Sequence, residues 1–452
     1  MAPIGHTVVI GSGLAGLTAV AALAPHTGRV TLLERDRLPE DARFRPGVPQ
    51  SRHLHSLMCS GQDALERLLP GFGADLRAAG AVELRAPWDH LWLSAAEWCT
   101  RFAPTHVVPS ASRELVESVA RSRVAALDAV SVREGAEAVG LLGDGTRVRG
   151  VRVRDRAGTR EEVAADLVVD ASGRSSHVLD WVAATGSGRP RSTVVDSRAG
   201  YASRYYRVPE GFADDWRIIS LGNHPSETLH GGALVPIEGG RWHVSLFGYL
   251  DDHPPTDDAG FLEFARSLRD PVLYDTITKA EPLGPVRGFR RMANERHHVE
   301  ETDHWPAGLI LLGDALCALN PVYAQGMSAA ALSAVALAEW AADGATAADA
   351  AGFHRRLAPD LDRFWQVAVG ADNAYLADPD APVSEEARRS AEQSGRLLHA
   401  AMVDPVVNRT FFDVMMLLAP PDALAAPDLV ERVERASRTP ANTRPPFDRP
   451  AL

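Results

Sequence analysis

The sequence has 452 residues, of which 45% are hydrophobic and 23% charged, a composition typical of a globular protein with two or three domains. Its formal net charge of −12 argues against nucleic acid or an anionic membrane surface as a partner. The chain opens on a strand pattern without the features of a secretory signal, and no apolar run reaches the ~18 residues that cross a bilayer. Three scattered cysteines fit a reducing compartment and form no zinc-binding spacing, so we expect a cytoplasmic protein without a membrane span or a metal site.

The first 35 residues carry the pattern of a dinucleotide-binding β-α-β unit. A short apolar strand leads into Gly11, Gly13 and Gly16 and then into an Ala/Leu-rich helix. Gly11 permits a tight turn, Gly13 lets the backbone approach a pyrophosphate, and Gly16 lets helix and strand pack closely. The next strand ends at Glu34, which can accept hydrogen bonds from ribose hydroxyls and repels a 2′-phosphate, so FAD or NAD is favoured over NADP. The residues predicted to contact the dinucleotide here are Gly11, Ser12, Gly13, Leu14, Ala15, Gly16, Glu34 and Arg35.

The next segments alternate between loop, helix and strand patterns. Residues 36–50 are rich in Pro and Arg and predict a loop, and residues 52–69 predict a helix. Residues 112–128 also have helical periodicity. Residues 146–154 alternate apolar and polar side chains after a Gly-Asp-Gly turn, which indicates a hairpin, and residues 166–170 indicate a buried strand.

The stretch between about 196 and 250 is mainly of β type and is crowded with aromatic residues. Two apolar runs within 228–249 are joined by Glu-Gly-Gly, which predicts a second hairpin. Most of the aromatic side chains are expected to pack in the core or across strands. The alternative is that one face of the sheet lines an apolar substrate pocket. The candidates for such a pocket are Tyr201, Tyr205, Trp242 and Phe247.

Two further motifs carry chemistry. Asp170 and Gly173 lie where a strand ends, which suits close approach to phosphate or ribose, although an ordinary Asx turn has the same sequence. Gly313 and Asp314 end another buried strand, and Pro321 and a helix starting near Gly326 follow. A carboxylate at a strand end can bind ribityl hydroxyls, and a helix N-terminus can stabilise negative charge on a flavin ring. The alternative is a packed strand, loop and helix without a ligand.

These three motifs, in this order, resemble the fingerprints of class A flavoprotein monooxygenases, the p-hydroxybenzoate hydroxylase-like group. The resemblance covers roughly residues 5–345. Residues 45–55, 235–242 and 319–327 look like one branch of that group. The branch includes the polyene epoxidases of polyether antibiotic pathways and flavin-containing cyclases of spirotetronate and tetramate pathways.

The resemblance implies roles for single residues around the adenosine and phosphates. Glu34 would bind the adenosine ribose, and Ala138 would contact adenine through its main chain. Arg113 matches an arginine that contacts ribityl or phosphate, and Asp314 would hold ribityl or pyrophosphate.

Around the flavin ring, the resemblance implies contacts from Pro321 and from the amides of Gly326 and Met327. His53 and His55 match an Arg-x-x-His segment beside the flavin, and the alternative for either histidine is ordinary packing. The residues of this segment predicted to bind the cofactor are Gln50, Arg52 and His53. The chain departs from the usual pattern at three positions, namely Cys317, Ala324 and Ser328.

The predicted fold is α/β: a Rossmann-type FAD-binding domain with a mixed-sheet substrate domain and a C-terminal helical region. The FAD-binding domain is expected to be discontinuous, and the C-terminal region is expected to end in a Pro-rich tail from Thr439. The predicted boundaries are 1–75 with 100–185 and 285–345 for the FAD-binding domain, 76–99 with 186–284 for the substrate domain, and 346–452 for the C-terminal region.

The function implied by the resemblance is an FAD-dependent monooxygenase acting on a large apolar natural-product intermediate. NAD(P)H would be the transient reductant of non-covalent FAD, and dioxygen would give a flavin C4a-hydroperoxide that epoxidises or hydroxylates the substrate. This chemistry requires no side-chain nucleophile, and none is predicted. The main alternative is an FAD-containing cyclase that catalyses a non-redox [4+2] reaction. A flavin halogenase is disfavoured because Lys279 is the only lysine and no Trp-x-Trp-x-Ile-Pro run is present.

Overall fold

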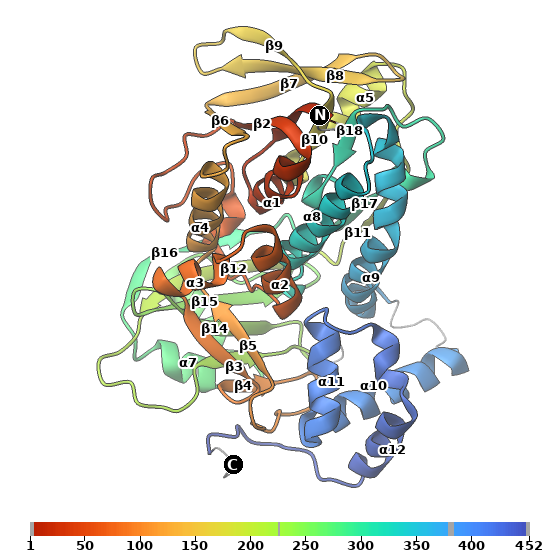
Figure 1. The fold of residues 1–452 in the computed structure, drawn as a ribbon. Coiled ribbons are helices and arrows are strands. Elements are labelled where there is room, and N and C mark those ends of the chain that lie inside the picture. The colour runs from red at the N-terminus through yellow and green to blue at the C-terminus, as the bar shows by residue number, and fades with distance from the viewer. Residues whose placement is uncertain (1–3, 225–226, 378–383, 449–452) are drawn as a thin grey trace.

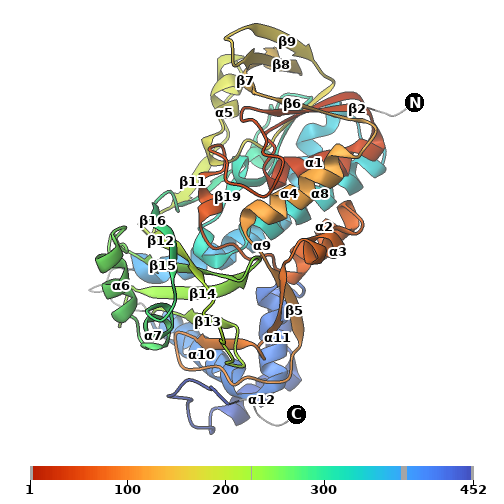
Figure 2. The same ribbon diagram turned by 90° about the vertical axis from the view of Figure 1, so that its left-hand side faces the viewer.

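The computed structural model describes residues 4–224, 227–377 and 384–448, which form a mixed α/β fold (Figure 1). A parallel sheet and its helices occupy one end of the molecule, and a larger mixed sheet occupies the other end (Figures 1 and 2). The last helices of the chain lie beside the mixed sheet. Among the helices described, none is long and apolar enough to cross a membrane.

The parallel sheet has five strands and is apolar because both of its faces are covered. Its strand order is β18 (Leu309–Leu311), β10 (Leu167–Asp170), β1 (Ile4–Ile10), β2 (Thr27–Glu34) and β6 (Val130–Glu134). The helices on one face are α1 (Leu14–Leu23), α4 (Arg113–Ala125) and α8 (Gly326–Ala342). The other face is covered by an antiparallel sheet of β7 (Ala136–Gly143), β8 (Val148–Asp155) and β9 (Arg160–Ala164). This arrangement confirms the predicted parallel β-α-β start and the hairpin predicted over 146–154.

The mixed sheet has six strands, which are antiparallel except for the β13–β4 pair. Its order is β16 (Pro282–Phe289), β12 (Gly200–Arg207), β15 (Arg241–Gly248), β14 (Gly231–Ile237), β13 (Ile218–Leu221) and β4 (His90–Leu93). Its outer face packs on α6 (Asp258–Arg266) and α7 (Val272–Ile277). The predicted hairpin over 228–249 is the β14–β15 pair.

Smaller elements join the two sheets. These are α2 (Cys59–Leu68), α3 (Phe72–Ala78), α5 (Val178–Ala184), the β3 (Val82–Ala86) and β5 (His106–Ser110) pair, and the strands β11 (Ser192–Val195), β17 (Asn294–His297) and β19 (Cys317–Ala318). The C-terminal helices are α9 (Ala350–Leu376), α10 (Glu385–Val403), α11 (Pro405–Met415) and α12 (Pro427–Ala436). The chain after α12 has no helix or strand as far as residue 448, and residues 449–452 of the predicted tail lie outside the described residues.

The helix predicted over 52–69 begins later than expected. Helix α2 starts at Cys59, and the chain from His53 to Met58 is not helical. Its polar groups bond to other parts of the molecule: the Leu54 amide donates to Ser245 Oγ (3.2 Å), and the Met58 amide donates to Ser328 Oγ (3.1 Å). Tertiary hydrogen bonds therefore replace the helical bonds that the local sequence allows.

Candidate functional site

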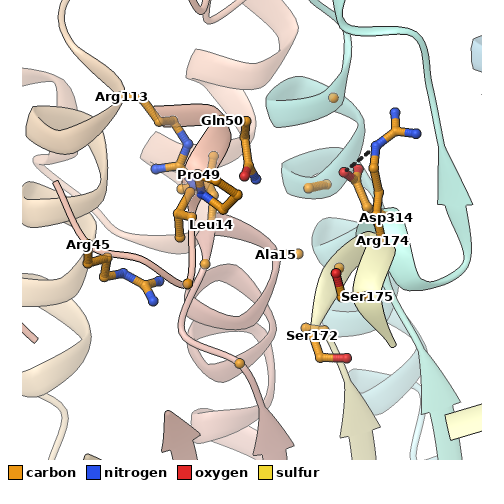
Figure 3. A pocket seen from close by; sticks show the side chains of 18 of the residues that line it. Leu14, Ala15, Arg45, Pro49, Gln50, Arg113, Ser172, Arg174, Ser175 and Asp314 are labelled. Carbon is orange, nitrogen blue, oxygen red and sulfur yellow. Dashed lines mark ion pairs between the residues drawn. The ribbon is translucent and has the colours of Figure 1, made fainter. Parts of the chain in front are cut away.

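A cavity of about 430 Å³ lies where the carboxyl ends of β1, β2, β10 and β18 meet the start of α8. In an open α/β sheet this edge is where ligands bind. Figure 3 shows Arg45 and Arg113 on one side of the cavity and Arg174 with Asp314 on the other. The predicted residues that line it are Gly11, Gly13, Leu14, Ala15, Glu34, Arg35, Gln50, Arg113, Ala138, Gly173, Asp314, Pro321, Gly326, Met327 and Tyr201. The predicted residues that do not line it are Ser12, Gly16, Arg52, His53, Asp170, Gly313, Tyr205, Trp242 and Phe247.

The glycine turn between β1 and α1 has the geometry that a pyrophosphate site requires. Gly11 has φ +93°, a conformation that side chains other than glycine rarely adopt. A Cβ on Gly16 would lie 1.8 Å from the Gly11 carbonyl oxygen, so only glycine fits there. A Cβ on Gly13 would meet no atom within 4 Å, because this glycine faces the cavity. The N-terminus of α1 therefore presents bare backbone to the cavity.

Glu34 lies at the end of β2 in a buried ionic network. Its Oε2 accepts hydrogen bonds from the Ser12 amide (3.0 Å) and hydroxyl (2.7 Å) and lies 3.0 Å from Arg45 Nη1. Burial raises the pKa of Glu34, but Arg45 and the hydrogen bonds from Asp36 and Ser12 outweigh it and leave this pKa below its ordinary value. Glu34 is thus a fixed anion at the cavity wall.

Arg45 joins Glu34 to helix α4 and was not among the predicted site residues. Its Nε donates to Glu117 Oε1 (2.6 Å), and its Nη1 lies 3.2 Å from Asp36 Oδ2. It follows β2 in the Pro- and Arg-rich loop, where the sequence carries no signal other than an arginine two residues before Gly47. Only the fold brings its side chain to Glu117, 72 positions further along the chain.

Two guanidinium groups at the cavity have unused donors. Within the described part of the chain, the buried Nη2 of Arg45 and Nη1 of Arg113 have no hydrogen-bond acceptor, although Arg113 Nη1 lies 3.3 Å from Glu117 Oε2. Such buried donors are costly unless a ligand satisfies them. Together with the bare glycine turn, they fit an anionic dinucleotide.

Asp170 does not line the cavity but holds the backbone turn that forms part of the cavity wall. It is fully buried, and its carboxylate accepts hydrogen bonds from the Ser172 amide (3.1 Å) and the Ser176 hydroxyl (2.5 Å). Burial raises the pKa of Asp170, and the bonds from these serines oppose that shift. The carboxylate shapes the turn that brings Gly173, at φ +80°, to the cavity wall. The Asx-turn alternative therefore describes Asp170 itself, whereas Gly173 lines the cavity.

Asp314 follows the turn at Gly313 and lies beside Arg174 on the same side of the cavity (Figure 3). The Arg174 Nε lies 3.6 Å from Asp314 Oδ2, and this arginine also donates to the carbonyl oxygens of Ala293 (2.6 Å) and Leu319. Gly313 has φ +63°, and a Cβ there would lie 2.6 Å from the Ala15 side chain, so Gly313 packs against α1 while Asp314 points to the cavity.

The three departures from the usual pattern lie in β19 (Cys317), in the loop before α8 (Ala324) and in the first turn of α8 (Ser328). Ala324 has φ +56°, a left-handed conformation that costs about 1–2 kcal/mol for a non-glycine residue. Ser328 is buried and accepts the Met58 amide, which ties the start of α8 to the segment before α2. Burial raises the pKa of Cys317 to about 12, so this thiol stays protonated and packs as a small apolar residue.

The mixed sheet closes the other end of the cavity. Side chains alternate between its two faces along each strand, and this alternation determines which aromatic residues face the site. Residues 201, 203 and 205 of β12 pair with 247, 245 and 243 of β15 and share one face. Trp242 has the opposite parity: it is 2% exposed and packs edge-to-face on Phe212 (5.0 Å between centroids) in the core under α6 and α7. Trp242 is thus part of that core and not of the pocket wall.

The inner face of this sheet carries neutral polar groups among the aromatic rings. His53 Nδ1 lies 2.9 Å from Ser203 Oγ, and its ring packs on Tyr201 (4.5 Å between centroids). Burial, reinforced by His55 and Arg52, lowers the pKa of His53 to about 3, so the imidazole is neutral at physiological pH. Tyr205 packs on His243 at 4.3 Å.

Phe289 of the pocket wall was not predicted, whereas His55 was expected beside the flavin. Phe289 of β16 lines the cavity and stacks on Tyr201 at 5.6 Å, and His55 lines it nearby. Phe247 lies in the same apolar cluster as Tyr201 and Phe289 but does not itself line the cavity. Phe289 lay outside the aromatic stretch 201–249 on which the prediction rested, and strand pairing with β12 brings it to the site.

Comparison with known proteins agrees with this geometry. A protein-family profile described as an FAD binding domain matches residues 6–350. The chain is 31% identical over 436 residues to "Protein Rv3254" of Mycobacterium tuberculosis (strain ATCC 25618 / H37Rv), covering 92% of this chain and 90% of that protein.

Solved structures share the fold at low sequence identity. The flavin-dependent brominase Bmp2 matches with a TM-score of 0.64 and 17% identity over 95% of this chain and 99% of that chain. A flavoprotein/dehydrogenase from Cytophaga hutchinsonii matches with a TM-score of 0.67 and 15% identity over 96% and 98%. The 2-methyl-3-hydroxypyridine-5-carboxylic acid oxygenase matches with a TM-score of 0.61 and 20% identity over 86% and 96%.

The chain belongs to the FAD-binding class A flavoprotein monooxygenase family. Membership supports an enzyme that has FAD as its cofactor and acts on a small molecule.

Proposed function

We propose that this protein is an FAD-dependent monooxygenase that epoxidises or hydroxylates a large apolar natural-product intermediate, with NAD(P)H as reductant. The observation that carries the proposal is one continuous cavity that joins all three flavin motifs to an apolar wall of the mixed sheet. FAD, when bound, supplies the transfer of one oxygen atom from dioxygen to the substrate. The residues of this chain bind FAD and the substrate, orient them relative to each other and exclude water from the site.

The adenosine end of the cavity is assigned to Glu34 and Ala138, which both line it. The pyrophosphate is assigned to the backbone of residues 11–16 at the N-terminus of α1, with the free donors of Arg45 and Arg113 nearby. A helix N-terminus and guanidinium N–H groups that have no hydrogen-bond acceptor within the described residues are matched to phosphate charge.

The flavin end is assigned to Asp314, Pro321 and the amides of Gly326 and Met327. Asp314 is the carboxylate of this end and would accept hydrogen bonds from ribityl hydroxyls. Helix α8 begins at Gly326, where a Cβ would meet nothing within 4 Å, so its free N–H groups and positive dipole end are open to the cavity. This is the feature of the chain that favours negative charge on the ring.

The substrate is assigned to the space beside Tyr201 and Phe289. These stacked rings offer a rigid apolar wall, and the neutral His53 behind them adds no charge. We therefore expect an uncharged, mainly hydrocarbon substrate to displace water from this end of the cavity.

The test uses the purified protein in two steps. Acid precipitation should release FAD from a yellow protein, and a colourless protein that takes up no FAD at micromolar concentration contradicts the cofactor assignment. Extracts of the producing cell are then supplied with NAD(P)H and labelled dioxygen. One labelled oxygen atom in the product supports monooxygenation. A product of unchanged mass, formed without NAD(P)H, assigns the protein to the cyclases, and a halogenated product assigns it to the halogenases.

A further inference from the structure

A buried carboxylate on helix α9 contacts the loop that precedes α8. Asp372 lies outside the segment matched by the FAD-binding family, and it is 0% exposed. Asn294 and Asn320, which surround it, are also 0% exposed. Its side chain accepts hydrogen bonds from Asn294 Nδ2 (2.6 Å), from Asn320 Nδ2 (3.0 Å to Oδ1 and 3.1 Å to Oδ2) and from the Tyr323 hydroxyl (2.7 Å to Oδ1).

The Asp372 carboxylate is surrounded by neutral hydrogen-bond donors, which is unusual for a buried charge that only stabilises a helix. Among the ion pairs of the described residues, none involves Asp372, so its hydrogen-bond donors are neutral amides and a phenol. Burying a carboxylate without a cation is costly, and complete hydrogen bonding is what makes it tolerable. Burial, with Tyr249 and Asp372 nearby, raises the pKa of Tyr323 far above its ordinary value, so the phenol remains a donor.

Three of these four bonds come from the loop at residues 319–324, and the fourth comes from Asn294, which itself bonds to that loop. Asn320 is held at its amide, which donates to Asn294 Oδ1 (2.7 Å), and its own Oδ1 accepts the Val322 amide (3.1 Å). Asp372 thus fixes Asn320 and Tyr323, the residues on either side of Pro321 and Val322. Leu319, Pro321 and Ala324 of this loop line the cavity.

The same part of α9 also contacts the mixed sheet. Tyr375, one turn beyond Asp372, stacks on Tyr249 with 3.9 Å between ring centroids, and the Tyr249 hydroxyl lies 3.3 Å from the Tyr323 hydroxyl. The loop, the end of β15 and α9 therefore meet at one point. Ala324 has a strained backbone conformation, and such a conformation persists only when contacts from the surrounding structure hold it in place.

We infer that Asp372 is a positioning residue for the flavin site: it holds the loop 319–324 in the conformation that presents Pro321 and the start of α8 to the isoalloxazine ring. This inference rests on the proposed placement of the flavin at that loop. Asp372 itself does not line the cavity and touches no reacting atom.

The decisive variant is Asp372→Leu, which keeps the approximate shape and removes both acceptor oxygens. Asn320 and Tyr323 then lose their anchor, and we expect FAD to dissociate more readily, with Kd raised roughly tenfold or more. The visible circular dichroism of the bound flavin should change as well, because the ring environment changes. Asp372→Asn retains one acceptor oxygen and should restore part of both properties. Asp360→Asn is the matched control: Asp360 lies on α9, its side chain is 46% exposed, and its one ion pair among the described residues is with Arg363 at 3.5 Å, so the Kd of this variant should equal that of wild type within about twofold.

Kd is measured by flavin fluorescence titration of the apoprotein, and melting temperature is recorded in parallel. If Asp372→Leu lowers the melting temperature while Kd and the circular dichroism stay at wild-type values, Asp372 is merely structural and the inference is overturned. If that variant does not fold, Tyr323→Phe decides, since it removes a single bond to Asp372: a several-fold higher Kd with an altered spectrum supports the inference, and unchanged values overturn it. Wild-type protein that binds no FAD would instead contradict the proposed function.

Discussion

The two sheets that enclose the cavity offer opposite kinds of surface. At the edge of the parallel sheet the wall is ionic, with Glu34, Arg45, Arg113 and Asp314 at or near hydrogen-bond distance of other charged groups. On the inner face of the mixed sheet the wall is aromatic, and its buried His53 is neutral. This difference indicates what each end of the cavity is suited to bind. Fixed charges and backbone amides complement a dinucleotide, whereas rigid neutral rings complement an apolar substrate.

The glycine turn provides the largest expected effect on the ionic side. Gly16→Ala would place a Cβ 1.8 Å from a backbone oxygen that cannot move aside, so the variant should lose bound FAD and much of its stability. Gly13→Ala should keep the melting temperature of the apoprotein, because its Cβ meets only the open cavity, and should raise the Kd for FAD by roughly tenfold or more. Fluorescence titration and thermal melts separate the two effects. Equal loss of stability in both variants would contradict this division.

On the aromatic side, two residues of β15 whose side chains point to opposite faces of the sheet should differ in how much their substitution destabilises the protein. Trp242→Ala should destabilise the protein by about 3–5 kcal/mol because it empties part of the core. Phe247→Ala, at a half-buried position facing the other way, should cost only about 1 kcal/mol. With substrate, Phe247→Ala should release more hydrogen peroxide for each product formed, because Phe247 packs in the same apolar cluster as the cavity-lining Tyr201 and Phe289. Urea unfolding gives the stabilities, and a peroxide assay with product quantification gives the coupling.

Glu34→Ala and Asp314→Ala test the ionic wall directly. Losing a charge-assisted bond to a buried ligand costs about 1.5–3 kcal/mol, so Glu34→Ala should weaken FAD binding at least tenfold. Asp314→Ala should weaken it less, because the Asp314 side chain is 35% exposed and solvent screens its charge. Retention of FAD through gel filtration, followed by titration, measures both. Wild-type affinity in Glu34→Ala would show that this carboxylate serves the protein network alone.

Lowering the pH should affect the two sides in separate ranges. Burial lowers the pKa of His53 and His243 to about 3, whereas unfolded histidines protonate near the ordinary value of 6.5. The unfolded state then binds more protons below pH 6.5, so the free energy of unfolding should fall steadily from pH 6.5 towards 4. Glu34 has a lowered pKa, so its contribution is present above its unfolded value of 4.5 and is lost only as the pH falls through its folded pKa.

Thermal melts between pH 4 and 8 give the slope of the free energy of unfolding against pH. His53→Gln, which cannot be protonated and keeps a partner for Ser203, should reduce the slope above pH 4.5. A slope that does not change would mean that His53 is protonated in the folded protein.

The smallest effect is expected at Lys279. Its side chain is exposed, lies after α7 and does not line the cavity. Lys279→Ala should therefore leave FAD affinity, stability and turnover unchanged within error, as steady-state kinetics will show. Loss of turnover with FAD still bound would reopen the halogenase alternative.

The local sequence was sufficient for the features that backbone geometry imposes. Gly11 and Gly16 are required by a positive φ and by a contact of 1.8 Å, and such constraints leave few residue choices within a short stretch. The carboxylates of Glu34, at the end of β2, and of Asp314, in the turn after β18, could also be predicted to lie at the cavity, because parallel strands bring their carboxyl ends to one edge.

Tertiary structure alone decided the rest. Period 2 separates Trp242 from Phe247, but which face of the sheet is core depends on what packs against it, here α6 and α7. The start of α2 at Cys59 depends on hydrogen bonds to β15 and α8, and the roles of Arg45 and Asp372 depend on partners between 9 and 78 positions away. Long-range pairs of this kind leave no periodic signal in the chain, because their free energy exists only once the fold has brought the partners together.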